Sequence, residues 1–115
     1  MLDKRNFYIN GKWVEPFKPN DFEVINPSNE ETCAVVSLGN EEDVNSAVKA
    51  AKESFPRWSR VEKKYKISLI EKLYKIYESR WEEMTKSISL EMGAPIDWAS
   101  SAQTSSGADH IKDFI

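Results

Sequence analysis

Two side chains have the types needed for covalent catalysis, the single cysteine Cys33 and the single histidine His110. A cysteine nucleophile needs hydrogen-bond contact with a base, and a third group must orient that base. Cys33 lies between Thr32 and Ala34 in a β-prone run, with no adjacent basic residue to favour its thiolate. We therefore predict that Cys33 is a structural strand residue, that His110 packs or faces solvent, and that the chain holds no catalytic residue. One cysteine and one histidine are also too few for a zinc site.

Glycines are the second place to look for chemistry, because phosphate-binding loops need them at close spacing. The four glycines are scattered along the chain, at Gly11, Gly39, Gly93 and Gly107. No Gly-rich loop follows a strand and opens a helix. The sequence therefore predicts no nucleotide-binding residue.

The segment 57–80 is locally basic, with eight Lys or Arg against three Glu. A basic amphipathic helix can bind a partner or an acidic membrane surface. The competing interpretation, which we favour, is a solvated outer face over an apolar inner one. Both readings stay open at the level of sequence.

The totals exclude several classes of protein. The 115 residues carry a net charge of −3, with 40 % hydrophobic and 30 % charged residues, as in soluble globular proteins. An acidic balance predicts no nucleic-acid partner, and no apolar run approaches the roughly 18 residues that would predict a membrane span. The N-terminus has no apolar signal core. A single cysteine favours a reducing, cytoplasmic setting.

The elements expected to position these residues begin with short strands over about 7–38. Asn10-Gly11 between two β-prone runs predicts a hairpin over 7–14. Further strands are expected over 22–27 and 32–38, together forming a small antiparallel meander.

Helices follow, expected over about 41–55, 59–78, 80–92 and 97–115. Asn40 is a good N-cap for the first of these, and Pro56 is expected to end it. The apolar pattern of 59–92 is too long for one helix, so a break is expected at 78–80. Gly93 and Pro95 stop the run, with Gly93 in a left-handed cap. We treat residues 1–115 as a single partial domain, because the final helix stops in mid-pattern. That stop predicts a longer protein cut short, the alternative being fraying at a natural end.

Five groups of residues, in this order, resemble the N-terminal part of the NAD(P)-dependent aldehyde dehydrogenase superfamily. They are Tyr8 to Val14, Phe22 to Asn29, Glu42 to Ala51, Phe55 to Trp58 and Leu90 to Pro95. The resemblance extends from about Phe7 to Ile115.

The resemblance implies an α/β fold whose opening segment is α+β. Short antiparallel strands are followed by three to four helices, an incomplete piece of the cofactor-binding domain. Family enzymes oxidise aldehydes to carboxylic acids with NAD or NADP, through a cysteine nucleophile, an oxyanion hole and a glutamate that activates water. In family members all of these lie beyond the position of Ile115. The implied partners are an aldehyde for the parent enzyme and, for this segment, the rest of the enzyme or a second copy. The segment alone is expected to be inactive.

The resemblance also implies a monovalent cation site. Many members bind K⁺ or Na⁺ through backbone carbonyls before an Asn-Pro pair and a carboxylate at a helix end, often an Asp. The matching positions here are Val24, Ile25 and Glu91. Oxygen ligands of this kind suit a hard cation, and a Glu at a helix C-terminus is otherwise disfavoured by the dipole.

A hypothesis from another class is a free-standing helical module that binds a partner through its basic face. Self-association through exposed apolar helix faces is expected if the chain is part of a larger protein.

Overall fold

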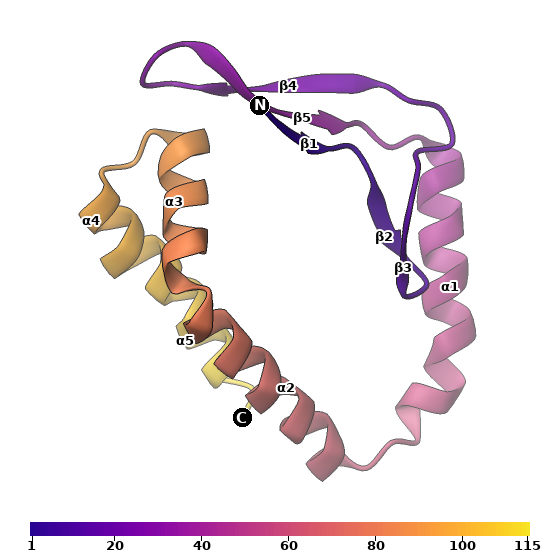
Figure 1. Ribbon diagram of the computed structural model, residues 1–115. Coiled ribbons are helices and arrows are strands. Elements are labelled where there is room, and N and C mark those ends of the chain that lie inside the picture. Colours follow the sequence, from indigo (N-terminus) through magenta and orange to yellow (C-terminus); the bar gives the residue numbers. More distant parts are fainter. The chain divides into compact units, whose positions relative to one another are not determined.

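The structure, a computed structural model, describes residues 1–115 as five short strands followed by helices (Figure 1). The strands are β1 (Leu2–Lys4), β2 (Phe7–Ile9), β3 (Lys12–Val14), β4 (Asp21–Asn26) and β5 (Glu31–Ser37). The helices are α1 (Glu41–Ser59), α2 (Lys63–Ser79), α3 (Trp81–Met92), α4 (Ile96–Trp98), the π-helix η1 (Ala99–Thr104) and α5 (Ser105–Lys112). The chain divides into two compact units. The first holds Met1–Ile25 and Glu30–Arg60, and the second holds Asn26–Asn29 and Val61–Ile115.

The hairpin of the first unit is β2 paired antiparallel with β3, in a register that sets Phe7 opposite Val14. Asn10 and Gly11 both have positive φ, 52° and 77°. Two such residues make a tight turn whose twist matches that of the strands. The predicted hairpin is confirmed.

The remaining strands form a separate sheet in the order β1-β5-β4. β1 runs parallel to β5, with Leu2 opposite Ala34, whereas the short connection between β4 and β5 permits only an antiparallel pair. The expected single meander is therefore wrong, because the hairpin pairs with itself and leaves an edge of β5 to the N-terminal residues. β1 has only three residues and all are exposed, so no apolar alternation announces it.

Helix α1 begins with the predicted cap. The Asn40 side chain accepts the Asp43 N–H at 3.0 Å, and the Asp43 carboxylate accepts the Asn40 N–H at 3.0 Å, a reciprocal capping box. The buried Asp43 also accepts the Phe17 N–H at 2.8 Å. The expected end at Phe55 is too early, since the helix continues through Pro56 to Ser59. Proline removes one helical donor, which the last turns of this helix tolerate.

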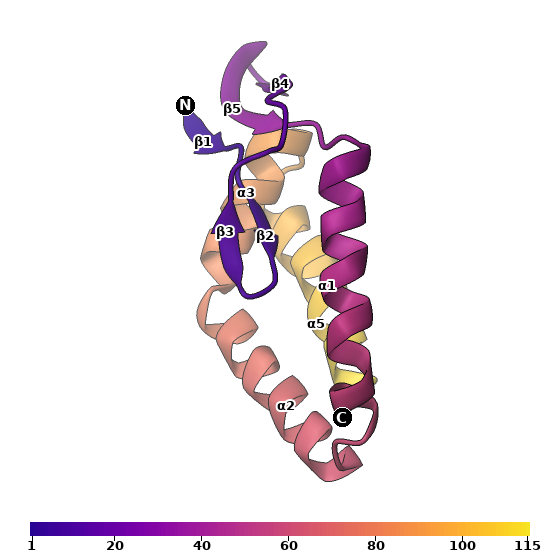
Figure 2. The same ribbon diagram turned by 90° about the vertical axis from the view of Figure 1, so that its right-hand side faces the viewer.

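Small side chains of α1 face the hairpin. Ala47, Ala50, Ala51 and Ser54 lie around the turn residues 8–11, and Figures 1 and 2 both show the hairpin beside α1. Short side chains let backbone approach backbone, so a two-stranded ribbon can lie close to the helix.

In the second unit, α2 and α3 are separated at Arg80, whose backbone leaves the helical region at φ −109° and ψ 19°. This confirms the break expected at 78–80. The second helix begins at Lys63 rather than at 59, because α1 occupies Ser59. α3 ends at Gly93, whose φ of 70° is the predicted left-handed cap.

The last helical segment differs from the regular helix expected over 97–115. It widens into a π-helix over Ala99–Thr104 and ends at Lys112. Its residues pack on α2 and α3 (Figure 2). Ala99, Thr104 and Ala108 are buried there.

The apolar interior is small. Only Val35, Ala99 and Ala108 are buried hydrophobic residues, and most large apolar side chains are exposed. No helix is long and apolar enough to cross a membrane.

Candidate functional site

The two carbonyl residues of the expected cation site lie near the end of β4, before the turn that leads to β5. Val24 is half-buried, and its carbonyl oxygen accepts a hydrogen bond from the Cys33 thiol at 3.3 Å. A carbonyl oxygen has two lone pairs, so this contact leaves one available. Ile25 is the exposed neighbour in the strand.

The turn after β4 is held by Asn26. Its side-chain oxygen accepts the Ser28 N–H at 2.9 Å, and its carbonyl accepts the Asn29 N–H at 3.3 Å. Pro27 of this turn lies against the helix cap at Gly93, where a built Cβ would come within 2.7 Å of Pro27 Cγ. The end of α3 and the Asn-Pro turn therefore fit together only with glycine at position 93.

Glu91 lies in the last turn of α3, two residues before that cap. Its side chain is exposed and forms no ion pair or hydrogen bond. An unpaired carboxylate and a carbonyl with a free lone pair are the oxygen donors that a hard monovalent cation requires, so the donor set fits. Val24 and Ile25 belong to the first unit and Glu91 to the second, so their assembly into one site stays a prediction. No cluster of three or more His, Cys, Asp or Glu side chains is placed to hold a metal ion.

The two residues with nucleophile or base chemistry are not arranged for catalysis. The half-buried Cys33 donates its thiol hydrogen to a backbone carbonyl within the sheet. His110 is exposed on α5 and forms no hydrogen bond or ion pair. Neither has the hydrogen-bonded partner that an activated nucleophile requires.

A polar seam between helices was not foreseen from the sequence. The Thr85 and Thr104 hydroxyls lie 3.0 Å apart, and the Tyr77 hydroxyl donates to the Thr104 carbonyl at 3.0 Å. The Trp81 indole N–H donates to the Ser100 hydroxyl at 2.9 Å. These bonds tie the π-helix to α2 and α3. A spacing of four residues between Tyr77, Trp81 and Thr85 was the available signal, since it places all three on one helical face.

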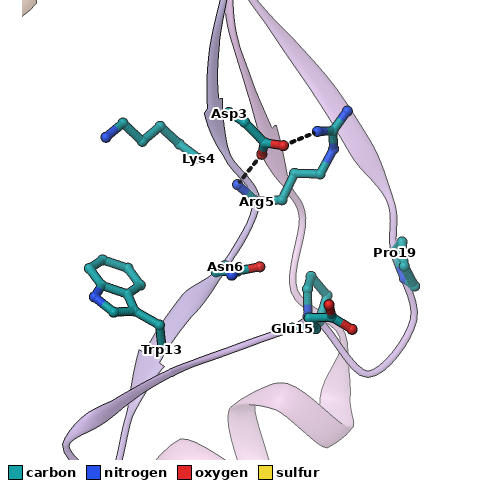
Figure 3. Close-up of a pocket in the computed structure, with 8 residues that line it drawn as sticks. Asp3, Lys4, Arg5, Asn6, Trp13, Glu15 and Pro19 are labelled. Carbon is teal, nitrogen blue, oxygen red and sulfur yellow. Dashed lines mark hydrogen bonds and ion pairs between the residues drawn. The ribbon is translucent and has the colours of Figure 1, made fainter.

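The largest hollow of the first unit, about 700 Å³, lies between β1, the hairpin and the following loop (Figure 3). Arg5 donates to Asp3 at 2.6 Å and to Asp21 at 3.0 Å. The hydrogen bond to Asp21 raises the pKa of the Arg5 guanidinium above its usual value. The two carboxylates neutralise this cation, and the other lining residues provide no nucleophile or imidazole, so the hollow has no catalytic group.

Comparison with known proteins gives a consistent result. The model of the aldehyde dehydrogenase family matches residues 13–115. A 3-succinoylsemialdehyde-pyridine dehydrogenase of a Pseudomonas species is 42 % identical over 112 residues, covering 96 % of this chain and 24 % of that protein.

Solved structures show the same fold. The aldehyde dehydrogenase of Bartonella henselae is 50 % identical with a TM-score of 0.95, covering 97 % of this chain and 24 % of that one. Aldehyde dehydrogenase C of Pseudomonas syringae, solved with NAD⁺ and octanal, is 37 % identical with a TM-score of 0.92, covering 94 % of this chain and 22 % of that one. The predicted fold class, α+β as the opening segment of the family fold, is confirmed.

The chain spans about a quarter of the length of these relatives and matches their N-terminal segment. The order of motifs, the family model over residues 13–115 and the shared fold agree. The chain belongs to the aldehyde dehydrogenase family.

Proposed function

We propose that this chain is the N-terminal part of a cytoplasmic aldehyde dehydrogenase that oxidises an aldehyde to a carboxylic acid with NAD or NADP. The observation that carries the proposal is the similarity to the Bartonella henselae enzyme over 97 % of the chain at a TM-score of 0.95. In this reaction the aldehyde carbon gives a hydride to the nicotinamide and gains an oxygen from water. The NAD⁺ complex of the Pseudomonas syringae relative supports the cofactor class.

The segment is proposed to have no activity alone. Its cysteine bonds to a strand carbonyl, and its histidine has no partner. The residues present do not fit a dinucleotide, because the positive-φ glycines Gly11 and Gly93 serve a hairpin turn and a helix cap rather than a phosphate loop. The chemistry is therefore assigned to the polypeptide that follows this segment in the relatives.

The cation proposal concerns Val24, Ile25 and Glu91, which would hold K⁺ or Na⁺ in the parent enzyme. It is supported by the exposed, unpaired carboxylate of Glu91 and by the packing of the Asn-Pro turn on Gly93. A cation here would attach the strand end to the helix end, a structural role distant in kind from catalysis.

The free-standing partner-binding module is not favoured. Its basic residues on α2 are mostly exposed, as a solvated face requires, and the family match covers nearly the whole chain. The predictions of no nucleic-acid partner and no membrane partner stay predictions.

A chimera tests the proposed function. Residues 1–115 replace the corresponding segment of the Bartonella henselae enzyme, and the formation of reduced nicotinamide is followed with a panel of aldehydes. We expect the chimera to oxidise aldehydes and the isolated chain to show no rate above the blank. A chimera that folds as the parental enzyme does but has no activity contradicts the proposal, and so does activity of the isolated chain.

A further inference from the structure

The chain exposes more surface than its mass requires. Its accessible surface is 9039 Å², whereas two independent globular halves of this mass would expose only about 7,700 Å² in total. This comparison is independent of how the two units are arranged. The excess is therefore a property of the units themselves, which leave apolar faces uncovered.

The clearest uncovered face is a stripe on α1, formed by Val44, Val48, Phe55 and Trp58. These side chains are 58 %, 59 %, 65 % and 45 % exposed. Together with Ala51 they follow a 4-3-4-3 spacing, so they fall within an arc of roughly 80° on the helix. This spacing is typical of a seam between packed helices.

The stripe is not the face that α1 uses within its own unit. The side that meets the hairpin carries Ala47, Ala50 and Ser54. The opposite side carries charged and polar residues, including Glu53, as expected of a face in solvent. The large apolar side chains are thus gathered on a third face, where no element of the first unit covers them. Monomeric soluble proteins rarely leave such a row exposed.

We propose that this stripe of α1 is a docking surface for the part of an aldehyde dehydrogenase that follows this segment in the relatives, through an apolar helical face of that part. The inference rests on the proposed function. The relatives hold the same segment, at a TM-score of 0.95, in a chain of which it is only 24 %. They therefore contain three quarters of a chain that can cover the stripe, and no second copy is needed.

Thiol labelling tests the proposal. In a Cys33→Ser background, Val48→Cys places a thiol in the stripe, and Glu53→Cys is the matched control on the opposite side of the same helix. Each variant is made in the isolated chain and in the full-length chimera. Maleimide labelling of the α1 peptide is then followed by mass spectrometry, which separates it from cysteines elsewhere in the chimera.

In the isolated chain we expect both thiols to be labelled at similar rates. In the chimera, labelling of the Val48→Cys variant should slow by about tenfold or more, because thiol reactions require access to the sulfur, while the Glu53→Cys control should not change. Equal labelling of both thiols in the chimera overturns the proposal. Protection of the Val48→Cys thiol in the isolated chain, together with a dimer in sedimentation, overturns it in favour of a second copy.

The two proposals fail separately. An active chimera with a freely labelled stripe contradicts the docking surface and leaves the enzymatic function intact. A folded, inactive chimera with a protected stripe supports the docking surface and contradicts the proposed function.

Discussion

Replacing Gly93 by alanine tests the junction between the Asn-Pro turn and the end of α3. Two independent costs apply. Gly93 has a φ of 70°, and an L-residue in this left-handed region costs about 1–2 kcal/mol. The new Cβ would also lie 2.7 Å from Pro27 Cγ, and overpacking of this kind costs roughly 1–3 kcal/mol. We therefore expect Gly93→Ala to lower the free energy of unfolding by about 2–5 kcal/mol.

A double-mutant cycle separates the two costs. Pro27→Ala removes Cγ but keeps a Cβ, which would lie 3.5 Å from the Cβ at position 93, an ordinary contact. In that background Gly93→Ala should cost only the conformational part, about 1–2 kcal/mol. The difference between the two backgrounds is the coupling between the turn and the cap.

The assay is urea unfolding, followed by circular dichroism and by tryptophan fluorescence to check that both probes report one transition. Gly39→Ala is the control, since a Cβ there meets only Phe7 at 3.6 Å and the backbone φ is not in the left-handed region. Its effect should be neutral or slightly stabilising. Equal losses from Gly93→Ala in both backgrounds would refute the proposed contact with Pro27.

Three other changes test further features. Asn40→Ala removes the capping acceptor of α1 and should cost about 1 kcal/mol in urea unfolding, whereas Asn45→Ala on the exposed side of the helix should cost under about 0.5 kcal/mol; equal losses would speak against the cap. Thr85→Val removes one hydroxyl of the buried pair and should cost about 1–2 kcal/mol; a loss below about 0.5 kcal/mol, usual for exposed positions, would show that the pair contributes nothing. In the chimera, KCl should raise the Tm relative to choline chloride at equal ionic strength, and Glu91→Gln should remove most of that shift while Glu82→Gln does not; a shift that survives Glu91→Gln would place the cation elsewhere.

Local signals in the sequence predicted the features that depend on one or two residues. Asn10-Gly11 set the hairpin turn, because both positions need positive φ. Asn40 set the start of α1 and Gly93 the end of α3, each through a single backbone requirement. The break at Arg80 followed from the length of the apolar pattern.

Features that depend on distant partners were not predictable in this way. The parallel pairing of β1 requires an open edge on β5, which the residues of β1 do not encode. Helix α1 continues past Pro56 because only one donor is lost in its last turns. The π-helix has no composition of its own, and its position depends on the bonds that Tyr77 and Thr85 make to Thr104.

The candidate site shows the same division. The sequence placed Val24 and Ile25 before an Asn-Pro turn and Glu91 before a helix end, and each residue lies on the expected element. The contact of Pro27 with Gly93 could not be inferred, because it joins residues far apart in the chain.

The π-helix over Ala99–Thr104 has a consequence for how the last helix is numbered against its surroundings. A π turn contains one residue more than an α turn needs, so it shifts the phase of every later side chain by about 100°. Ala108 is buried and the hydroxyl of Tyr77 reaches the backbone at Thr104, above the glycine at position 107, only in this shifted phase. Deleting one residue within the π turn would restore regular geometry there without changing the composition of α5. The extra residue therefore acts as a spacer that sets which side of α5 meets α2.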